Sequence, residues 1–275
     1  MRVSTSGVLQ NAVMTGIRSE SVCVVDHADG GTVFIGGYWG ATAVTSTFDT
    51  PWDGGASAGK RVFASSAPRS DIWTVFPAGG AVFAGGYTRD SRFLGALWRY
   101  DAGAWDDVTP TGGFLLDGGL ALVTAGWGTS ADDFFVTGEQ DDFVQVVNQV
   151  VHVKDGVPTA FVLPDTPLGV WGTGSNDVWI GGQGFIARLR DGALTVLDAG
   201  VGVVWNSVWA ADSSSVVLGG AGPSESCPGL VARWSPDAVD SQCLDPYAAI
   251  TSVHGVSSTD IWAVSADGGI WHYGP

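Results

Sequence analysis

The sequence is poor in charged residues, and it has few of those that favour helices. Only 15% of its 275 residues are Asp, Glu, Lys or Arg, whereas about a quarter is usual. Three of the 28 acidic residues are Glu, and two of the 12 basic residues are Lys, at Lys60 and Lys154. The chain instead has 41 Gly and 13 Trp, which are typical of turns and strands. The composition therefore argues against a helical protein and predicts an all-β fold.

Long hydrophobic runs are also missing. No apolar stretch approaches the roughly 20 residues of a membrane-spanning helix, and residues 1–16 lack the apolar core of a signal peptide. Either the chain stays inside the cell, or a signal that preceded it has been removed. The formal net charge of −16 argues against nucleic-acid partners and anionic membranes, because both attract clustered Lys and Arg. The acidity favours an extracytoplasmic or secreted protein, and a cytoplasmic location stays open.

One short pattern occurs six times along the chain. Each copy has a polar or small residue, two or three apolar residues and then small residues, as in Asp177–Gly182. The copies align on one apolar anchor residue each: Phe34, Phe83, Phe135, Trp179, Val217 and Trp262. Successive anchors are 49, 52, 44, 38 and 45 residues apart. The four-stranded blades of β-propellers repeat about every 40 to 50 residues, and a two-sheet sandwich would not explain so regular a period.

The two ends of the chain together make one further period. Thirteen residues follow Trp262 and 34 lead up to Phe34, which gives 47. The last copy ends one strand short of a blade, so segment 3–14 is expected to supply that strand and close the ring, protecting the sheet edges. We therefore predict a six-bladed β-propeller of four-stranded antiparallel blades, forming a single domain over residues 1–275. The expected blades are residues 20–60, 70–112, 118–166, 167–200, 203–246, and 248–275 completed by 1–19.

Three segments carry a resemblance to known repeats. Trp171–Trp179 followed by Ile186–Gly192 resembles the degenerate propeller repeats of large bacterial secreted and surface proteins. Those repeats are similar to sialidase-type Asp-box repeats and to photosystem-assembly-factor propellers. Ser265–Trp271 is close to an Asp-box, without the usual Thr before the aromatic residue. The resemblance implies the fold alone, because the arginine triad and the Tyr/Glu pair of sialidases have no matching motif here.

The connections between the expected strands are uneven in length. From the anchor to the outer hairpin there are 12 residues in the fourth and sixth copies, and 15 to 20 in the others. The connections that enter the first three blades are about ten residues longer than the rest. In a four-stranded meander both kinds of connection leave on the same face of the disc, where binding residues are commonly found.

Nine residues in these longer connections are candidates for ligand binding. They are Tyr38, Trp39, Trp52, Tyr87, Arg89, Arg92, Glu139, Asp141 and Asp142. Aromatic rings could stack on a sugar or an apolar ligand, and paired arginines could hold a carboxylate or phosphate. The acids could accept sugar hydroxyls or bind calcium. The alternative interpretation is that the rings pack the loops down while the charged groups face water.

A second candidate site lies nearer the axis of the expected ring. The residues eight before each anchor are Trp127, Trp171 and Trp209 in copies three to five, Val75 in copy two, His254 in copy six and Asp26 in copy one. If the ring closes, His254 and Asp26 become neighbours, with His27 beside them. The catalytic hypothesis is a histidine general base oriented by Asp26. The alternative is a hydrogen bond between blades.

The remaining aromatic and acidic residues of the repeat have structural interpretations. Seven tryptophans are expected to pack between blades: Trp73, Trp98, Trp105, Trp179, Trp234, Trp262 and Trp271. Asp71, Asp177 and Asp260 are expected to precede second strands and to hydrogen-bond the turn.

The cysteines and histidines do not form a recognisable metal or catalytic motif. Cys227 and Cys243 are 16 residues apart, a separation that a disulfide could close, whereas Cys23 fits a buried thiol. The four histidines are scattered, no Cys-x-x-Cys occurs, and neither a Gly-x-Ser-x-Gly elbow nor a phosphate loop is visible.

Three functions are consistent with the sequence. The one most favoured is an extracytoplasmic binding module that recognises a saccharide, a small molecule or a surface protein through the longer loops of blades one to three. The second is a hydrolase-type or lyase-type enzyme at the central channel, with calcium as its metal. The third is a structural propeller that spaces other parts of a larger surface protein.

Overall fold

The computed structural model describes most of the chain from residue 70 onwards, and shorter stretches before it. The described ranges are residues 2–3, 9–10, 18–27, 30–39, 42–43, 46–49, 70–88, 95–101, 104–109, 120–141, 146–198, 202–235, 238–244 and 248–274. For residues 2–49 the description covers the backbone alone. Every regular element in these ranges is a β-strand, as the composition predicts.

Four groups of four consecutive strands each form an antiparallel meander, in which every strand pairs with the next. The first comprises β7 (Ser70–Ala78), β8 (Ala81–Thr88), β9 (Gly95–Asp101) and β10 (Ala104–Asp107). The second comprises β11 (Leu120–Ser130), β12 (Asp133–Asp141), β13 (Val146–Lys154) and β14 (Val157–Leu163). The third comprises β15 (Pro167–Gly174), β16 (Asp177–Gly182), β17 (Phe185–Arg190) and β18 (Ala193–Asp198). The fourth comprises β19 (Val204–Asp212), β20 (Ser215–Ala221), β21 (Gly229–Ser235) and β22 (Ala238–Leu244).

The sheets at the two ends of the chain are different. The last sheet has three strands: β23 (Ile250–Ser257), β24 (Asp260–Ser265) and β25 (Ile270–Tyr273). Before the meanders, β4 (Gly30–Trp39) pairs with β3 (Arg18–His27), β5 (Thr42–Ala43) and β6 (Ser46–Asp49). In the described part of the chain, β1 (Arg2–Val3) pairs with β2 (Leu9–Gln10), and β25 pairs with β24 alone. The expected pairing of the N-terminal segment with the last sheet is thus not among the described pairings.

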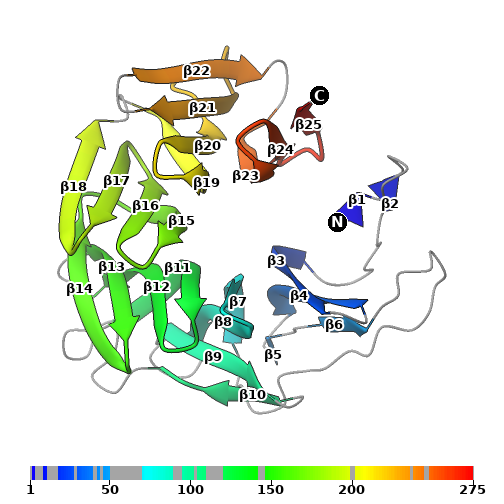
Figure 1. Cartoon of the computed structure of the whole chain (residues 1–275), viewed down its shortest axis with the longest axis vertical. Coiled ribbons are helices and arrows are strands. Elements are labelled where there is room, and N and C mark those ends of the chain that lie inside the picture. The colour runs from blue at the N-terminus through cyan, green and yellow to red at the C-terminus, as the bar shows by residue number, and fades with distance from the viewer. Residues whose placement is uncertain are drawn as a thin grey trace.

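The sheets are arranged around a common centre, as Figure 1 shows. The first strand of each group packs against the first strand of the next, in the order β3, β7, β11, β15, β19 and β23. Between β7 and β11 one parallel bridge joins Ala78 to Gly128. The fourth strands β10, β14, β18 and β22 lie on the outer rim. Curved antiparallel sheets that pack face to face around an axis make a β-propeller.

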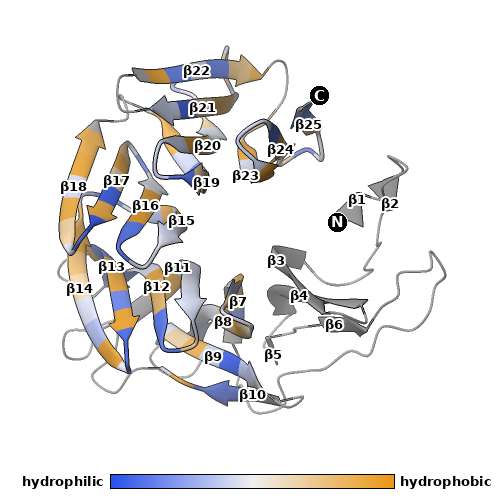
Figure 2. Cartoon of the chain, viewed as in Figure 1, coloured by the Kyte–Doolittle hydropathy of each residue, from blue (hydrophilic) through white to orange (hydrophobic). Residues whose placement is uncertain are grey.

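The core lies between the faces of neighbouring sheets. Because side chains alternate along a strand, two consecutive residues of β16 serve two different layers. Val178 packs with Phe135 of the preceding meander, and Trp179 packs with Val208 of the following one. Both Val178 and Trp179 have no exposed surface. Figure 2 shows hydrophobic residues on the strands of all the meanders, interleaved with hydrophilic ones.

The outer hairpins of blades three and four close with tight Asp-Gly turns. Asp155 and Asp191 have positive φ angles of 51°, and they are followed by Gly156 at 76° and Gly192 at 79°. Two consecutive residues with positive φ make the tight turn that suits the twist of a β-hairpin, and Asp-Gly is a preferred pair for it. The third and fourth strands of these two meanders are therefore held in register by their turns.

Candidate functional site

The two ends of the sheets differ in the length of their connections. At one end, the first and second strands are joined by two residues throughout, as at Gly79–Gly80 and Ser213–Ser214. The third and fourth strands of the four meanders are also joined by two residues there, as at Asp155–Gly156. At the opposite end, residues 50–69 join β6 to β7, residues 108–119 join β10 to β11, and residues 222–228 join β20 to β21. We call this second end the loop face and the first the short-turn face.

The distribution of long connections is the one that the spacing of the repeats predicts. Blade four (β15–β18) shows the minimum, because two residues, Gln183 and Gly184, join β16 to β17. The three residues 164–166 join β14 to β15. A meander therefore closes without extra residues at this end. The longer connections elsewhere are additions to the fold and lie on the loop face, where a rigid scaffold can present binding residues.

Five of the nine candidate ligand-binding residues lie on described strands, all near the loop face. Tyr38 and Trp39 end β4, Tyr87 is the penultimate residue of β8, and Glu139 and Asp141 lie in the last part of β12. Trp52, Arg89, Arg92 and Asp142 lie outside the described residues. The described strands thus bring the candidates from three sheets to one end of the molecule.

Tyr87 is held by a buried carboxylate. Its hydroxyl donates a hydrogen bond of 2.6 Å to Oδ2 of Asp71, which lies opposite it on β7. Asp71 is only 3% exposed. The expectation that Asp71 precedes a second strand is wrong, since it is the second residue of a first strand. The pair fixes the tyrosine ring at the loop face of blade two (β7–β10).

Glu139 borders a hollow on blade three (β11–β14). The hollow has an empty volume of about 200 Å³, and it is also lined by Val123, Val136, Gln149 and Val151. Pockets for drug-sized molecules usually measure about 300–1,000 Å³. This hollow is partly open to solvent and mostly apolar, so its described lining does not by itself enclose a drug-sized molecule.

The axial candidate His254 lies among tryptophan rings. It is opposite Trp262 in the sheet, as Trp127, Trp171 and Trp209 are opposite their own anchors. Its ring centroid is 5.4 Å from that of Trp171 and 6.1 Å from that of Trp209, both in edge-on contact. Burial lowers the pKa of His254. A neutral imidazole at pH 7 could accept a proton, as a general base must.

The proposed partner Asp26 does not share the position of His254. Cys23, not Asp26, lies opposite Phe34, and Asp26 lies opposite Gly31. In this first hairpin the anchor and the residue opposite it are 11 positions apart in the sequence. In blades three to five and in the last sheet the corresponding residues are eight positions apart. Val75 is likewise displaced, since Phe76 lies opposite Phe83. A constant offset of eight residues therefore fails in the first two sheets, and the placement of Asp26 and of His27 next to His254 stays a prediction.

A repeated acid–base pair on the short-turn face was not foreseen. Asp177 accepts hydrogen bonds of 2.7 and 3.0 Å from Nε and Nη2 of Arg188, whose guanidinium lies 4.6 Å from the ring centre of Trp179. The same arrangement joins Asp133 to His152 over Phe135, and Asp260 to His272 over Trp262, with nitrogen–oxygen distances of 2.7 and 2.8 Å.

Asp177 accepts a hydrogen bond of 3.0 Å from the hydroxyl of Thr173 beside the turn, as expected. In addition, a basic residue on the third strand binds the carboxylates of both Asp177 and Asp260, which was not predicted from the sequence. The available signal was an Asp two residues before the anchor together with a basic residue opposite the anchor on the third strand. The pairs fasten the second strand to the third, and they do not gather around a common centre.

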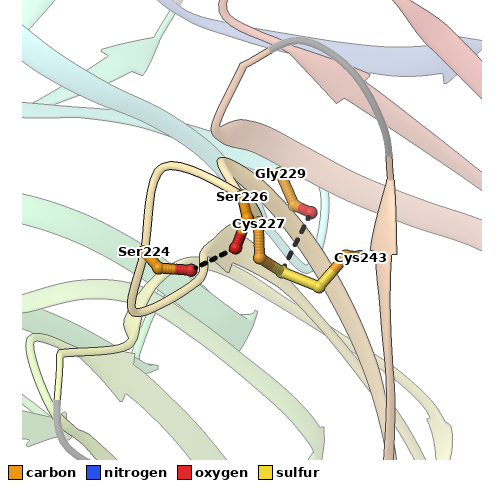
Figure 3. The surroundings of a disulfide bond; sticks show 5 residues. All are labelled: Ser224, Ser226, Cys227, Gly229 and Cys243. Carbon is orange, nitrogen blue, oxygen red and sulfur yellow. Dashed lines mark hydrogen bonds between the residues drawn. A yellow bond between two sulfur atoms is a disulfide. The ribbon is translucent and has the colours of Figure 1, made fainter.

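A disulfide braces one loop of the loop face. Cys227 and Cys243, the pair singled out by the sequence, are bonded to each other (Figure 3). The bond ties the connection 222–228 to the outer strand β22. Within that connection, Gly222 N donates to Cys227 O at 3.0 Å, and the hydroxyls of Ser224 and Ser226 lie 2.8 Å apart. This connection is therefore fixed to its blade.

Neither a metal centre nor a membrane-crossing helix is found in the described ranges. Among their His, Cys, Asp and Glu side chains, no three are placed together so that they could hold a metal ion. The same ranges contain no helix that is long and apolar enough to cross a membrane.

The comparisons with known proteins identify the fold. No protein-family model matches the sequence, and no curated protein is similar to it. The solved structure of YCF48 bound to D1 peptide aligns with 97% of this chain and 82% of its own, with a TM-score of 0.62 and 11% identity. A mutant sialidase of Trypanosoma rangeli aligns with 96% of this chain and 55% of its own, with a TM-score of 0.55 and 11% identity.

A third neighbour is an extracellular domain. It belongs to the putative hybrid two-component system BT3049 of B. thetaiotaomicron, and it aligns with 97% of this chain and 35% of its own, with a TM-score of 0.58 and 15% identity. The chain thus spans about a third of that protein's length. Both types of repeat that the sequence resembles, the sialidase type and the assembly-factor type, are found among the structural neighbours.

Proposed function

We propose that the chain is an extracytoplasmic binding module, and that it recognises a segment of a surface protein through its loop face. The proposal rests on the difference in connection length between the loop face and the short-turn face. All the long connections of the described meanders are on one face, and blade four shows that the fold does not need them. Residues that the scaffold does not need are available for recognition.

Two further observations favour a protein segment over a small molecule. The described lining of the hollow at the loop face does not by itself enclose a drug-sized molecule. One structural neighbour, YCF48, was solved with a bound peptide. A saccharide is the alternative ligand, for which the aromatic candidates Tyr38, Trp39, Trp52 and Tyr87 would serve as stacking platforms.

The extracytoplasmic location has its own support. The Cys227–Cys243 disulfide fits an oxidising compartment, and one structural neighbour is an extracellular domain.

The ring itself is proposed to have six blades, with the N-terminal segment as the fourth strand of the last blade. The support is the three-stranded last sheet beside four meanders of four strands. A disulfide engineered between Val8→Cys and Trp271→Cys variants tests this closure. Cross-linking in the folded protein is expected. A pair that stays reduced under oxidising conditions, while Cys227–Cys243 forms, would contradict the closure.

The enzyme remains a second candidate because of one observation. His254 has a lowered pKa and lies against Trp171 and Trp209 near the axis. If it is a general base in a hydrolase or lyase, turnover must disappear in His254→Ala, with or without added calcium. Activity that persists in this variant would exclude the role.

Binding is tested by selecting partners without bias. Immobilised protein is presented in parallel with a displayed peptide library and a glycan array. A double variant, Arg89→Ala with Glu139→Ala, changes the loop face, and a matched double variant, Thr195→Ala with Val196→Ala, changes exposed positions of β18 on the outer rim. We expect selected peptides to bind the loop-face variant at least about tenfold more weakly, a loss of roughly 1.4 kcal/mol, and the rim variant normally. Glycans alone, or equal loss in both variants, would overturn the proposal.

A further inference from the structure

Each first strand carries one extra residue at the same position. In β3, β7, β11, β15, β19 and β23 the pairing with the second strand shifts by one residue. In every sheet the shift lies opposite the two residues of the second strand that stand two and three positions after the anchor. The shift is therefore in the half of the first strand that is nearer the loop face. The extra residues are Glu20, Trp73, Thr124, Leu168, Asn206 and Thr251. A β-bulge of this kind redirects a side chain.

Three of these residues bond within the scaffold. Asn206 Nδ2 donates to Ile250 O of the next sheet at 2.9 Å, and Thr251 Oγ1 donates to Val264 O at 3.1 Å. The hydroxyl of Thr124 lies 3.0 Å from that of Thr137. Trp73 differs from them, because its large side chain is 45% exposed. Trp73 was expected to pack between blades, and its exposure corrects that expectation.

The neighbours of Trp73 on β7 are buried on the two faces of the sheet. Ile72, 2% exposed, packs in the layer on one face of β7. Thr74, 7% exposed, lies on the other face, where its methyl group and Val123 both border Gly85. Both faces of the sheet are thus occupied by the flanking residues. Trp73 lies between them at the bulge of β7, the first strand of its sheet, and its side chain is largely exposed.

An acidic residue holds the position on the neighbouring first strand that corresponds to Trp73. Glu20 holds the corresponding bulge position on β3, and β3 packs against β7. Asp71 lies two residues before Trp73 on the same strand. The chain as a whole carries a formal charge of −16, which attracts a basic partner. An exposed indole on a protein with this net negative charge favours a cationic side chain as its ligand.

We propose that Trp73 receives a Lys or Arg side chain of the bound protein segment at the axial end of the loop face. This inference rests on the proposed function and adds the chemistry of the ligand. The cation would lie over the indole face, and the net negative charge of the protein would favour its approach. The site is formed by a bulge rather than by a loop, so it is part of the rigid scaffold.

The probes are three labelled ten-residue peptides of Gly and Ser, carrying three Arg, three Gln or three Glu residues. Binding is measured by fluorescence anisotropy at low salt. The Arg peptide is expected to bind most tightly, and Trp73→Ala to weaken it by about 2- to 30-fold, as expected for a cation–π contact. Trp73→Phe is expected to fall between the two, and Glu20→Gln to weaken binding as well. The control is Val196→Ala, at an equally accessible position (49% exposed) on β18.

Two results would overturn the inference. One is an Arg peptide that binds no more tightly than the Gln peptide, and the other is equal binding by Trp73→Ala and by the control. Thermal unfolding of Trp73→Ala within about 2 °C of the unchanged protein ensures that a loss of binding is local. If selected peptides bind the loop face but contain no basic residue and ignore Trp73→Ala, this inference alone fails. If no peptide is selected at all, the proposed function fails with it.

Discussion

The short-turn face and the loop face are built from the same strands, yet they use them differently. On the short-turn face the connections are two residues long, and an Asp held by Arg or His recurs from sheet to sheet. On the loop face the connections range from two residues at Gln183–Gly184 to 20 at positions 50–69. Repetition at one end keeps the sheets alike, and it leaves the other end free to vary. The comparison can be tested by changing matched residues in each region.

The largest effect is expected for the interblade core. Trp179 has no exposed surface, whereas Trp73 is 45% exposed. Trp179→Ala should lower the free energy of unfolding by about 3–5 kcal/mol, and Trp73→Ala by less than about 0.5 kcal/mol. Urea unfolding followed by circular dichroism measures both. Similar losses in the two variants would show that Trp73 is a core residue and remove it from the binding face.

The disulfide of the loop face should have the next largest effect. Replacing Cys227 and Cys243 by Ser opens a loop of 16 residues, and the loss of chain constraint is about 3 kcal/mol. Thermal unfolding with and without reductant provides the comparison, since reductant should lower the melting temperature of the unchanged protein and leave the double variant as it is. An unchanged melting temperature in the variant would mean that the connection 222–228 is held by its other contacts.

The acid–base pairs of the short-turn face should contribute less each. Arg188 and Asp177 are 15% and 11% exposed in their side chains, so Asp177→Asn leaves a partly buried guanidinium with a weaker partner. The expected loss of stability is about 1–3 kcal/mol. Asp191→Asn, on the same face but 71% exposed in its side chain, is the matched control. An equal loss of stability in both variants would show that the Asp177–Arg188 pair does not stabilise the fold.

The smallest effect concerns the pH dependence of the axial histidine. Its pKa is lowered by burial in the folded protein, so the unfolded chain takes up a proton at His254 more readily. Stability is therefore fully present above the ordinary pKa near 6.5 and falls as the pH drops below that value. His254→Gln should flatten this part of the stability curve between pH 7 and pH 5. If the stability of His254→Gln changes with pH as steeply as that of the unchanged protein, other titratable groups cause the pH dependence.

Much of the fold could be predicted from one strand of the repeat. The pattern at Asp177–Gly182 coincides with β16, and blade four falls within the expected range 167–200. The uneven connections were also foreseen, because loop length is a property of spacing alone.

Features that depend on pairing between strands could not be predicted in the same way. Asp26 was misaligned because the first hairpin is longer than the others, and sequence offsets do not show hairpin length. Trp73 looked like every other tryptophan of the repeat, because a bulge becomes visible only when two strands are in register. The Asp177–Arg188 pair joins residues 11 positions apart on two strands, and only cross-strand register brings them together.

The two-residue link at Gln183–Gly184 has a practical consequence. It defines the shortest chain that lets a blade turn back on itself, and so it marks a site where foreign segments could be grafted without altering the sheets on either side. The other links of the described meanders already vary in length, so this end of the sheets tolerates such differences while the strands keep their pairing.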